Sequence, residues 1–311
     1  MQELRRGNAV ENAGTHGGLE DRGASAAAAA TAAATAAATA TAAAIATAAA
    51  IAGSFVAARR EARSLAEFPG AIPPNLDAAY QCQNLAIKSW PDRLIGWKVG
   101  MIPAALRAVY RAERLAGAIF QRGLREAAGE VEFPVFVGGF AAVEAEFVLR
   151  IAADAPAGKL DWSEQEARGL IGAMHIGIET AGSPLATINE LGPTVTAADF
   201  GNNAGLILGP EIRDWAARPL DSLTVVTSID GSIVGRGAAG LLLRGPVGAL
   251  QFLAGQTARM GRPLEAGMLV STGAVTGVHD IKAGQSAVAD FGSHGRISCL
   301  AVAAGPWLAP K

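Results

Sequence analysis

The stretch Val143-Glu-Ala-Glu-Phe-Val-Leu-Arg-Ile151 decides the fold class, because apolar and polar side chains alternate along it. Successive side chains of a β-strand point to opposite faces of the sheet. One face of this strand therefore carries the apolar side chains of Val143, Ala145, Phe147 and Leu149. The other face carries the carboxylates of Glu144 and Glu146. The pattern predicts a β-strand with at least one face packed in a core.

More strands are expected on both sides of this stretch, where short Val- and Ile-rich runs lie between glycines and other turn residues. They cover 95–100, 175–180, 205–209, 223–229, 268–272, 286–291 and 296–302. Helical spacing, caps and flanking prolines predict helices at 54–65, 75–90, 163–174 and 246–261. Arg59, Arg60 and Arg63 are expected on the outer side of the first of these. Together the elements predict an α+β fold, β-rich, with a helical N-terminal part.

The first fifty residues differ in composition from the rest of the chain. Residues 24–52 are almost entirely Ala and Thr, with Ile45 and Ile51 as the only large side chains. This tract is long enough to span a bilayer, but alanine contributes little transfer free energy per residue. A signal peptide would need a shorter apolar core directly after a basic start. We therefore expect residues 1–53 to be a low-complexity head outside the fold, with no membrane contact, and residues 54–311 to form one folded domain.

The overall charge and the cysteines exclude several classes of protein. The formal net charge of −2 and the scattered Lys and Arg residues argue against nucleic acid and acidic membrane surfaces as partners. The two cysteines, Cys82 and Cys299, are too few for a disulfide framework or a zinc site. We therefore expect a protein of the reducing cytoplasm.

Glu144 and Glu146 are two residues apart on the predicted strand, so they project from the same face, roughly 7 Å apart at the backbone. Two ionised carboxylates on one face repel each other, and a divalent cation between them removes that repulsion. Glu179, flanked by apolar residues on a separate predicted strand, is a third candidate ligand. Taken alone, an alternating strand of this kind is more typical of a sheet with one solvated face than of a metal site.

The order of several motifs favours the metal site. Gly96-Trp-Lys-Val-Gly100 is followed by Val143-Glu-Ala-Glu-Phe147 and then by Ile178-Glu-Thr180. This order resembles the 2-keto-4-pentenoate hydratase branch of the fumarylacetoacetate hydrolase superfamily. The resemblance covers about residues 54–304, and it continues through Asp199, Gly209, Gly245-Pro246, Leu264-Glu-Ala-Gly267, Thr272-Gly273 and Lys282-Ala-Gly-Gln285.

The resemblance implies a mixed β-sheet roll with flanking helices, and a hydratase-like catalytic domain over residues 54–311. Glu144, Glu146 and Glu179 would hold Mg²⁺ or Mn²⁺, which chelates and polarises a small 2-oxo acid. Lys98 would lie beside the substrate and handle a proton or an enolate charge, although an ordinary surface lysine is the alternative. A ligand carboxylate or Asp199 would activate water.

The implied reaction adds water to a 2-hydroxy-2,4-dienoate and gives a 4-hydroxy-2-oxo acid, a step in the degradation of aromatic compounds. Members of the family generally assemble as homo-oligomers, and the same is expected here.

The chain departs from the family pattern at four places near the substrate. Arg114 and Leu115 stand where hydratases usually carry an acidic residue, and Ser183 is followed by Pro184 instead of arginine. Phe200-Gly201-Asn202 replaces the usual Asn-Ala-Ser, and Ala274 replaces a serine. A paralogue that acts on a different 2-oxo acid therefore stays open.

Other activities can be weighed against the hydratase. Carbon–carbon hydrolases that cleave acylpyruvates usually need an N-terminal His-Glu pair, and this chain has no histidine between His16 and His175. The related 2-oxo-enoate decarboxylases need no such histidine and are the nearer rival. Residues 235–240 match the G-x-G-x-x-G pattern of nucleotide-binding oxidoreductases, but no helix opens directly after them. A scaffold or binding protein that lacks a metal is the remaining class.

Overall fold

The alternating stretch forms most of β5 (Phe140–Ile151), the middle strand of the larger of two β-sheets. The computed structural model describes residues 17–307, and their side chains from residue 30 onward. The larger sheet runs in the order β2 (Arg114–Phe120), β1 (Leu94–Met101), β10 (Leu269–Ser271), β5, β6 (Ile171–Ser183), β7 (Asn203–Glu211) and β3 (Leu124–Glu126). A short strand, β11 (His279–Asp280), also pairs with β5.

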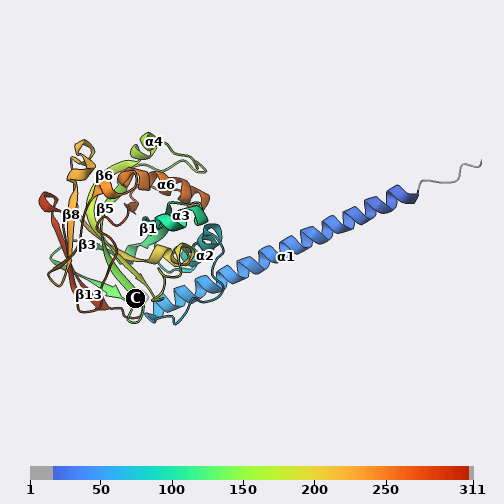
Figure 1. The fold of residues 1–311 in the computed structure, drawn as a ribbon, viewed down its shortest axis with the longest axis horizontal. Coiled ribbons are helices and arrows are strands. Elements are labelled where there is room, and N and C mark those ends of the chain that lie inside the picture. The colour runs from blue at the N-terminus through green and yellow to red at the C-terminus, as the bar shows by residue number, and fades with distance from the viewer. Residues whose placement is uncertain (1–16, 308–311) are drawn as a thin grey trace, which may run out of the picture. The chain divides into compact units, whose positions relative to one another are not determined.

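The smaller sheet has five strands. Its order is β4 (Glu130–Val135), β13 (Arg296–Ala303), β12 (Ser286–Asp290), β8 (Thr224–Ile229) and β9 (Ser232–Ala238). This sheet lies on one side of the larger sheet, and α2, α3 and α6 lie on the other (Figure 1). The phenyl rings of Phe147 on β5 and Phe291, which follows β12, meet edge to face at 5.6 Å between centroids, so one aromatic pair joins the two sheets. The predicted α+β fold of mixed, curled sheets with flanking helices is confirmed.

Six α-helices and six short 3₁₀ turns complete the described chain. The helices are α1 (Gly17–Glu61), α2 (Leu76–Ser89), α3 (Ala104–Tyr110), α4 (Glu164–Arg168), α5 (Pro193–Ala198) and α6 (Gly245–Arg259). The 3₁₀ turns are η1 (Gln121–Gly123), η2 (Phe200–Asn202), η3 (Trp215–Ala217), η4 (Leu220–Ser222), η5 (Ala239–Leu241) and η6 (Gly292–His294). Helix α2 begins where predicted, because the side chain of Asn75 caps it by accepting a hydrogen bond from the amide of Ala78.

The end of the Ala-rich tract is part of the folded core. The structure divides between Ala46 and Thr47 into two compact units, whereas the composition places the start of the domain at residue 54. The side chains of Ile51 and Ala52 are each only 2% exposed within the second unit. Residues Ala30–Glu61 are long and apolar enough to cross a membrane, with a mean hydropathy of 1.7. Length and composition alone decide that match, and a helix buried in a soluble core meets the same criteria.

One further sequence-based expectation, the extent of the helix at 163–174, differs from the structure. The helix expected to reach residue 174 ends at Arg168, and residues from Ile171 onward belong to β6. An apolar run of this length fits either element, and here pairing with β5 decides in favour of the strand. The glycines of the 235–240 motif lie mostly in β9, where a Cβ at Gly237 would be 2.2 Å from the carbonyl oxygen of Val275. These glycines therefore allow close packing of the backbone, and no helix-opening nucleotide loop forms.

Candidate metal centre

Three glutamates meet on one face of the β5–β6 pair. Glu144 on β5 lies directly opposite Glu179 on β6, and Glu146 follows two residues along β5. Residues directly opposite each other in an antiparallel pair project from the same face. As a result, carboxylate oxygens of all three residues lie within 4.8 Å of one another. The side chains are no more than 4% exposed, so the solvated-face interpretation of the alternation is wrong.

Hydrogen bonds orient two of the three carboxylates, those of Glu146 and Glu179, but leave one oxygen of each unpaired. Oε2 of Glu146 accepts hydrogen bonds from the hydroxyl of Ser271 at 2.6 Å and from the amide of Gly273 at 2.7 Å. Oε1 of Glu179 accepts one from the side-chain amide of Asn203 at 3.1 Å. The second oxygens, Oε1 of Glu146 and Oε2 of Glu179, are buried and have no hydrogen-bond partner among the described residues. Buried carboxylate oxygens without partners are the donor set that a hard divalent cation requires.

Without a cation, the buried carboxylates of the cluster repel one another. Burial, together with the charge of Glu179, raises the pKa of Glu144 to about 7, and the charge of Lys98 only partly opposes this. Burial and the charges of Glu179 and Glu144 raise the pKa of Glu146 well above its usual value. Three carboxylates in so small a buried volume repel one another, and a divalent cation between them would remove that repulsion.

Lys98, on β1, projects its ammonium group into this cluster. Its Nζ lies 3.1 Å from Oε1 of Glu179, and it donates hydrogen bonds to the carbonyl of Gly201 at 3.1 Å and to Oδ1 of Asn202 at 3.0 Å. The side chain is only 3% exposed, so Lys98 is not a surface lysine. Burial lowers its pKa, but the charges of Glu179, Glu144 and Glu146 outweigh burial and hold the pKa above its usual value. The ammonium group is a fixed positive charge beside the carboxylates.

The turn that holds Lys98 is itself in an unusual conformation. Phe200, Gly201 and Asn202 in η2 have φ values of 52°, 64° and 58°, although two of the three are not glycine. The turn also lies against β2, where a Cβ at Gly117 would be only 2.0 Å from the carbonyl oxygen of Phe200. Glycine at 117 therefore allows the turn to approach the sheet closely enough to reach Lys98.

A buried ion pair holds the start of this turn. Both oxygens of Asp199 accept hydrogen bonds from the guanidinium of Arg59, at 2.6 and 2.9 Å, and the hydroxyl of Ser183 donates to one of them at 2.6 Å. Arg59 also donates to the carbonyl of Asn203 at 3.0 Å. Arg59 was expected on the outer side of its helix, but only 8% of it is exposed. The hydrogen bonds among Arg59, Ser183 and Asp199 thus fix the segment whose residues contact Lys98 and Glu179.

A cavity of about 500 Å³ opens beside the cluster, and we call it the substrate cavity. Lys98 and Glu144 line it, and Asn189, Thr196 and Asn202 contribute uncharged polar groups. Its other walls are apolar or glycine, and they include Ile102, Leu106, Leu115, Ala274 and Val278. Leu115 and Ala274, two of the departures from the family pattern, therefore face this cavity, whereas Asp199 is not among its lining residues.

Neither His175 nor His279 belongs to the carboxylate cluster. Nδ1 of His175 lies 3.1 Å from the carbonyl oxygen of Gly209, and His279 contacts the hydroxyl of Thr276 at 3.2 Å. The chemistry of the centre therefore depends on carboxylates and one lysine.

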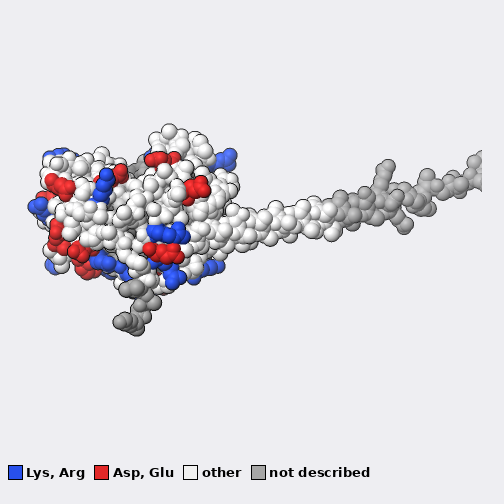
Figure 2. Space-filling view, turned by 90° about the horizontal axis from the view of Figure 1, so that it is seen from below, with Lys and Arg blue, Asp and Glu red and all other residues white. Residues whose placement is uncertain are grey.

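On the outside of the molecule, acidic and basic side chains are interspersed over the face seen in Figure 2, without one large area of a single sign.

Comparison with known proteins identifies the fold. No family model matches the chain. The 2-keto-4-pentenoate hydratase 1 of Dechloromonas aromatica (strain RCB) is 26% identical over 253 residues, which are 78% of this chain and 93% of that protein. The 4-oxalocrotonate decarboxylase from Pseudomonas putida G7, in complex with magnesium and adipate, is 20% identical with a TM-score of 0.69, over 82% of this chain and 97% of that chain.

A third protein is similar at a lower sequence identity and a lower TM-score. The fumarylpyruvate hydrolase from Pseudomonas aeruginosa, in complex with Mn²⁺ and pyruvate, is 16% identical with a TM-score of 0.50, over 69% of this chain and 91% of that chain. This chain therefore has the fold of the decarboxylase and the hydrolase. The three proteins that this chain resembles are each named as an enzyme.

Proposed function

We propose that this protein is a metal-dependent hydratase that adds water to a 2-hydroxy-2,4-dienoate and forms a 4-hydroxy-2-oxo acid. The observation that carries the proposal is the meeting of three buried carboxylates, with unpaired oxygens, beside a buried lysine at the wall of the substrate cavity. The hydratase of Dechloromonas aromatica supports this reaction over the others of the superfamily.

Glu144, Glu146 and Glu179 are the proposed ligands of Mg²⁺ or Mn²⁺. The all-oxygen donor set fits both ions, and the decarboxylase and the hydrolase with this fold are complexes with magnesium and Mn²⁺, respectively. When bound, the metal would supply Lewis-acid polarisation of the substrate's 2-oxo group. The orienting bonds from Ser271 and Gly273 to Oε2 of Glu146 leave Oε1 unpaired, so Oε1 would be the oxygen that holds the ion.

Lys98 has the proposed role of stabilising negative charge on the substrate. Its ammonium is held at a fixed place by three oxygens, so no reorganisation is needed when charge develops. Lys98 and Glu144 are the titratable residues that line the substrate cavity, because Leu115 stands where the family usually has an acid. Charge stabilisation is therefore assigned to Lys98, and proton transfer at the substrate to Glu144. Asp199, expected from sequence to activate water, is proposed instead to position the turn that holds Lys98.

The walls of the substrate cavity predict a preference for uncharged tails. Lys98 is the only cationic residue among the lining residues, and it already faces Glu179. A second carboxylate on the substrate would lose its hydration without gaining a partner. We expect kcat/KM for 4-oxalocrotonate to be at least about tenfold below that for 2-hydroxypenta-2,4-dienoate, as measured by steady-state kinetics. Leu106→Arg should reduce the difference, and an unchanged ratio in that variant would argue against the assignment of this wall to the substrate's tail.

Metal affinity should depend on pH in a defined window. The pKa of Glu144 lies at about 7 in the metal-free protein, above its usual value of 4.5, so a proton must leave this carboxyl when the ion binds at lower pH. Below pH 7 the affinity for Mg²⁺ is expected to fall by up to about tenfold per pH unit for each displaced proton. Calorimetry in two buffers of different ionisation enthalpy measures the protons released. Release that stays at zero from pH 6 to 8 would contradict the predicted ligand.

The proposed reaction is tested directly by incubating the full chain with 2-hydroxypenta-2,4-dienoate, with Mg²⁺ and with chelator. Loss of the dienol absorbance and a product heavier by one water, only with metal, are the expected results. Lys98→Met should lower kcat by about 10²-fold or more and leave Mg²⁺ binding measurable by calorimetry. Release of carbon dioxide from a 2-oxo-enoate substrate, without hydration, would replace the hydratase by a decarboxylase. Intact Mg²⁺ binding without turnover of either substrate would refute both activities and leave the metal site standing.

A further inference from the structure

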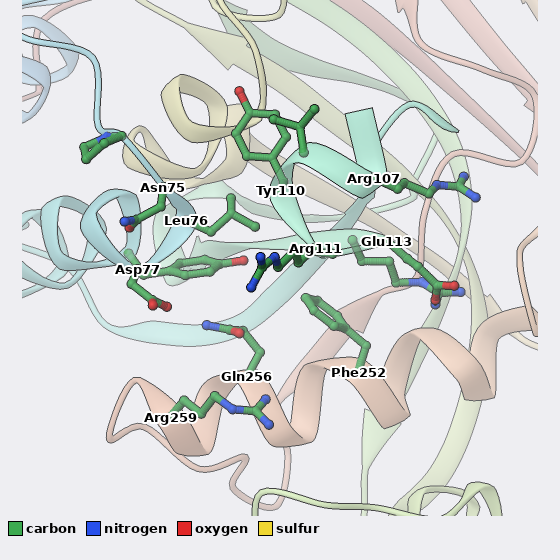
Figure 3. Close-up of a pocket in the computed structure, with 15 residues that line it drawn as sticks. Asn75, Leu76, Asp77, Arg107, Tyr110, Arg111, Glu113, Phe252, Gln256 and Arg259 are labelled. Carbon is green, nitrogen blue, oxygen red and sulfur yellow. The ribbon is translucent and has the colours of Figure 1, made fainter. Parts of the chain in front are cut away.

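A second large cavity among the described residues is separate from the carboxylate cluster. It measures about 910 Å³, and we call it the arginine cavity. Its walls come from the start of α2, the end of α3, the start of β2 and one side of α6. Figure 3 shows Arg111 between α2 and α6, with Phe252 and Gln256 projecting from α6 toward the same space; Arg259, also on α6, lines the cavity as well. Neither Lys98 nor any of the three glutamates lines this cavity.

The lining carries an excess of positive charge. Four arginines stand against two acidic residues, which leaves an excess of two charges: Arg107, Arg111, Arg114 and Arg259 against Asp77 and Glu113. Of the two acids, Glu113 is already engaged, because it pairs with Arg244 and lies 3.8 Å from Arg114. Arg111 and Arg259 are exposed, and their guanidinium groups have no hydrogen bond or ion pair to any residue in the described part of the chain. Two guanidinium groups therefore remain free to bind an anion directly.

Arg114 gives a second, independent indication. It is 1% exposed, and its Nη2 donates to the carbonyl of Leu243, but its Nε and Nη1 have no hydrogen-bond partner in residues 30–307. Burial, with the like charges of Arg244 and Arg107, lowers its pKa to about 10. A buried charge without a full set of partners is costly, and an anion in the adjoining cavity offsets that cost through its field. Arg114 thus acts on a ligand by charge, while Arg111 and Arg259 make the contacts.

We infer that the arginine cavity binds a dianionic phosphate monoester with an apolar group. The two excess charges match a dianion, and the planar guanidinium fork matches phosphate oxygens in pairs. Asn75, Tyr110 and Gln256 add neutral hydrogen-bonding groups to the lining, while Leu76, Val109 and Phe252 provide apolar surface for the organic part of the ligand. This inference is independent of the reaction proposed above, because it uses none of the residues of the carboxylate cluster.

Calorimetry on the full chain, dialysed against chelator at low ionic strength, tests the inference. Phenyl phosphate should bind saturably with one site per chain and more tightly than inorganic phosphate, and neutral phenol should not bind. Added salt should weaken the binding. Arg111→Gln and Arg259→Gln should each reduce the affinity for phenyl phosphate about tenfold, the loss of one charged hydrogen-bonding group. Arg60→Gln, which removes an exposed arginine on α1 outside this cavity, is the matched control and should leave the affinity unchanged.

Three results would overturn the inference. One is the absence of saturable binding at phenyl phosphate concentrations on the order of 10 mM, because a dissociation constant above this value would not indicate a specific site. Another is an equal loss of affinity in Arg60→Gln and Arg111→Gln, which means that binding follows net charge and not the cavity. The third is tighter binding of succinate than of phenyl phosphate, which would assign the cavity to dicarboxylates instead of phosphate esters.

Discussion

Replacing Glu146 by glutamine is expected to abolish metal-dependent turnover and, at the same time, to stabilise the metal-free protein. The amide oxygen of glutamine can still accept the hydrogen bonds that Ser271 and Gly273 donate to Oε2. The substitution removes one of three crowded carboxylates, and burial together with Glu179 and Glu144 raises the pKa of this one. Loss of that repulsion should raise the free energy of unfolding without metal by on the order of 1 kcal/mol at pH 8.

Thermal melts with chelator and with Mg²⁺ separate the two effects. In the unchanged protein, Mg²⁺ at about 100 times its Kd should stabilise by about 2.7 kcal/mol, or roughly 5–10 °C in Tm. Glu146→Gln should lose this shift while its melting temperature in chelator rises. Glu132→Gln, which changes an exposed carboxylate on β4, is the matched control and should keep the shift. Unchanged turnover of Glu146→Gln at saturating Mg²⁺ would refute the proposed ligand set.

Asp199→Asn should cause the largest loss of stability, about 3–5 kcal/mol, because it leaves the guanidinium of Arg59 charged and unpaired in the interior. Combining it with Arg59→Met removes the stranded charge and should restore a large part of that loss. Arg60→Met, on the same helix but exposed, should change the free energy of unfolding by less than about 0.5 kcal/mol. Urea unfolding of the three variants, with the m-value checked, gives the comparison.

The same variants decide what Asp199 does. A positioning role predicts that the variants which unfold more easily also lose turnover, and that the double variant recovers part of both. A role in water activation predicts the opposite pattern, in which Asp199→Asn keeps its stability and loses turnover, with no recovery on addition of Arg59→Met. The second pattern would restore Asp199 to the catalytic residues, as the family resemblance implies.

Local patterns predicted the parts of this fold that local physics decides. The alternation along β5, the cap of α2 at Asn75 and the proline-led start of α6 all follow from neighbours in sequence. The boundary between α4 and β6 was predicted wrongly, because an apolar run carries no period that separates a buried strand from a buried helix. Its strand state comes from β5, which is distant in sequence.

The candidate site shows the same division. Strand periodicity predicted that Glu144 and Glu146 lie on one face. The order of motifs, through the family resemblance, predicted that Glu179 joins them. Nothing near Arg59 indicates its burial, because its ion-pair partner is 140 residues away and its helix is too rich in alanine to define a polar face. In the turn at 200–202, Gly201 and Asn202 are residues that accept positive φ, but nothing in the sequence indicates the positive φ of Phe200. Long-range partners are what local patterns leave out.

The continuation of α1 from the Ala-rich tract into the core sets how far the chain can be shortened. A truncation at residue 54 follows the change in composition, yet it removes Ala48, Ile51 and Ala52, which are buried in the second unit. It also leaves Arg59 in the second turn of a helix whose preceding turns are gone, and short helices fray from their ends. A truncation at Thr47 retains those turns and the anchorage of Arg59. In this protein, the residue at which the composition changes is therefore not the residue at which the chain begins to support the candidate site.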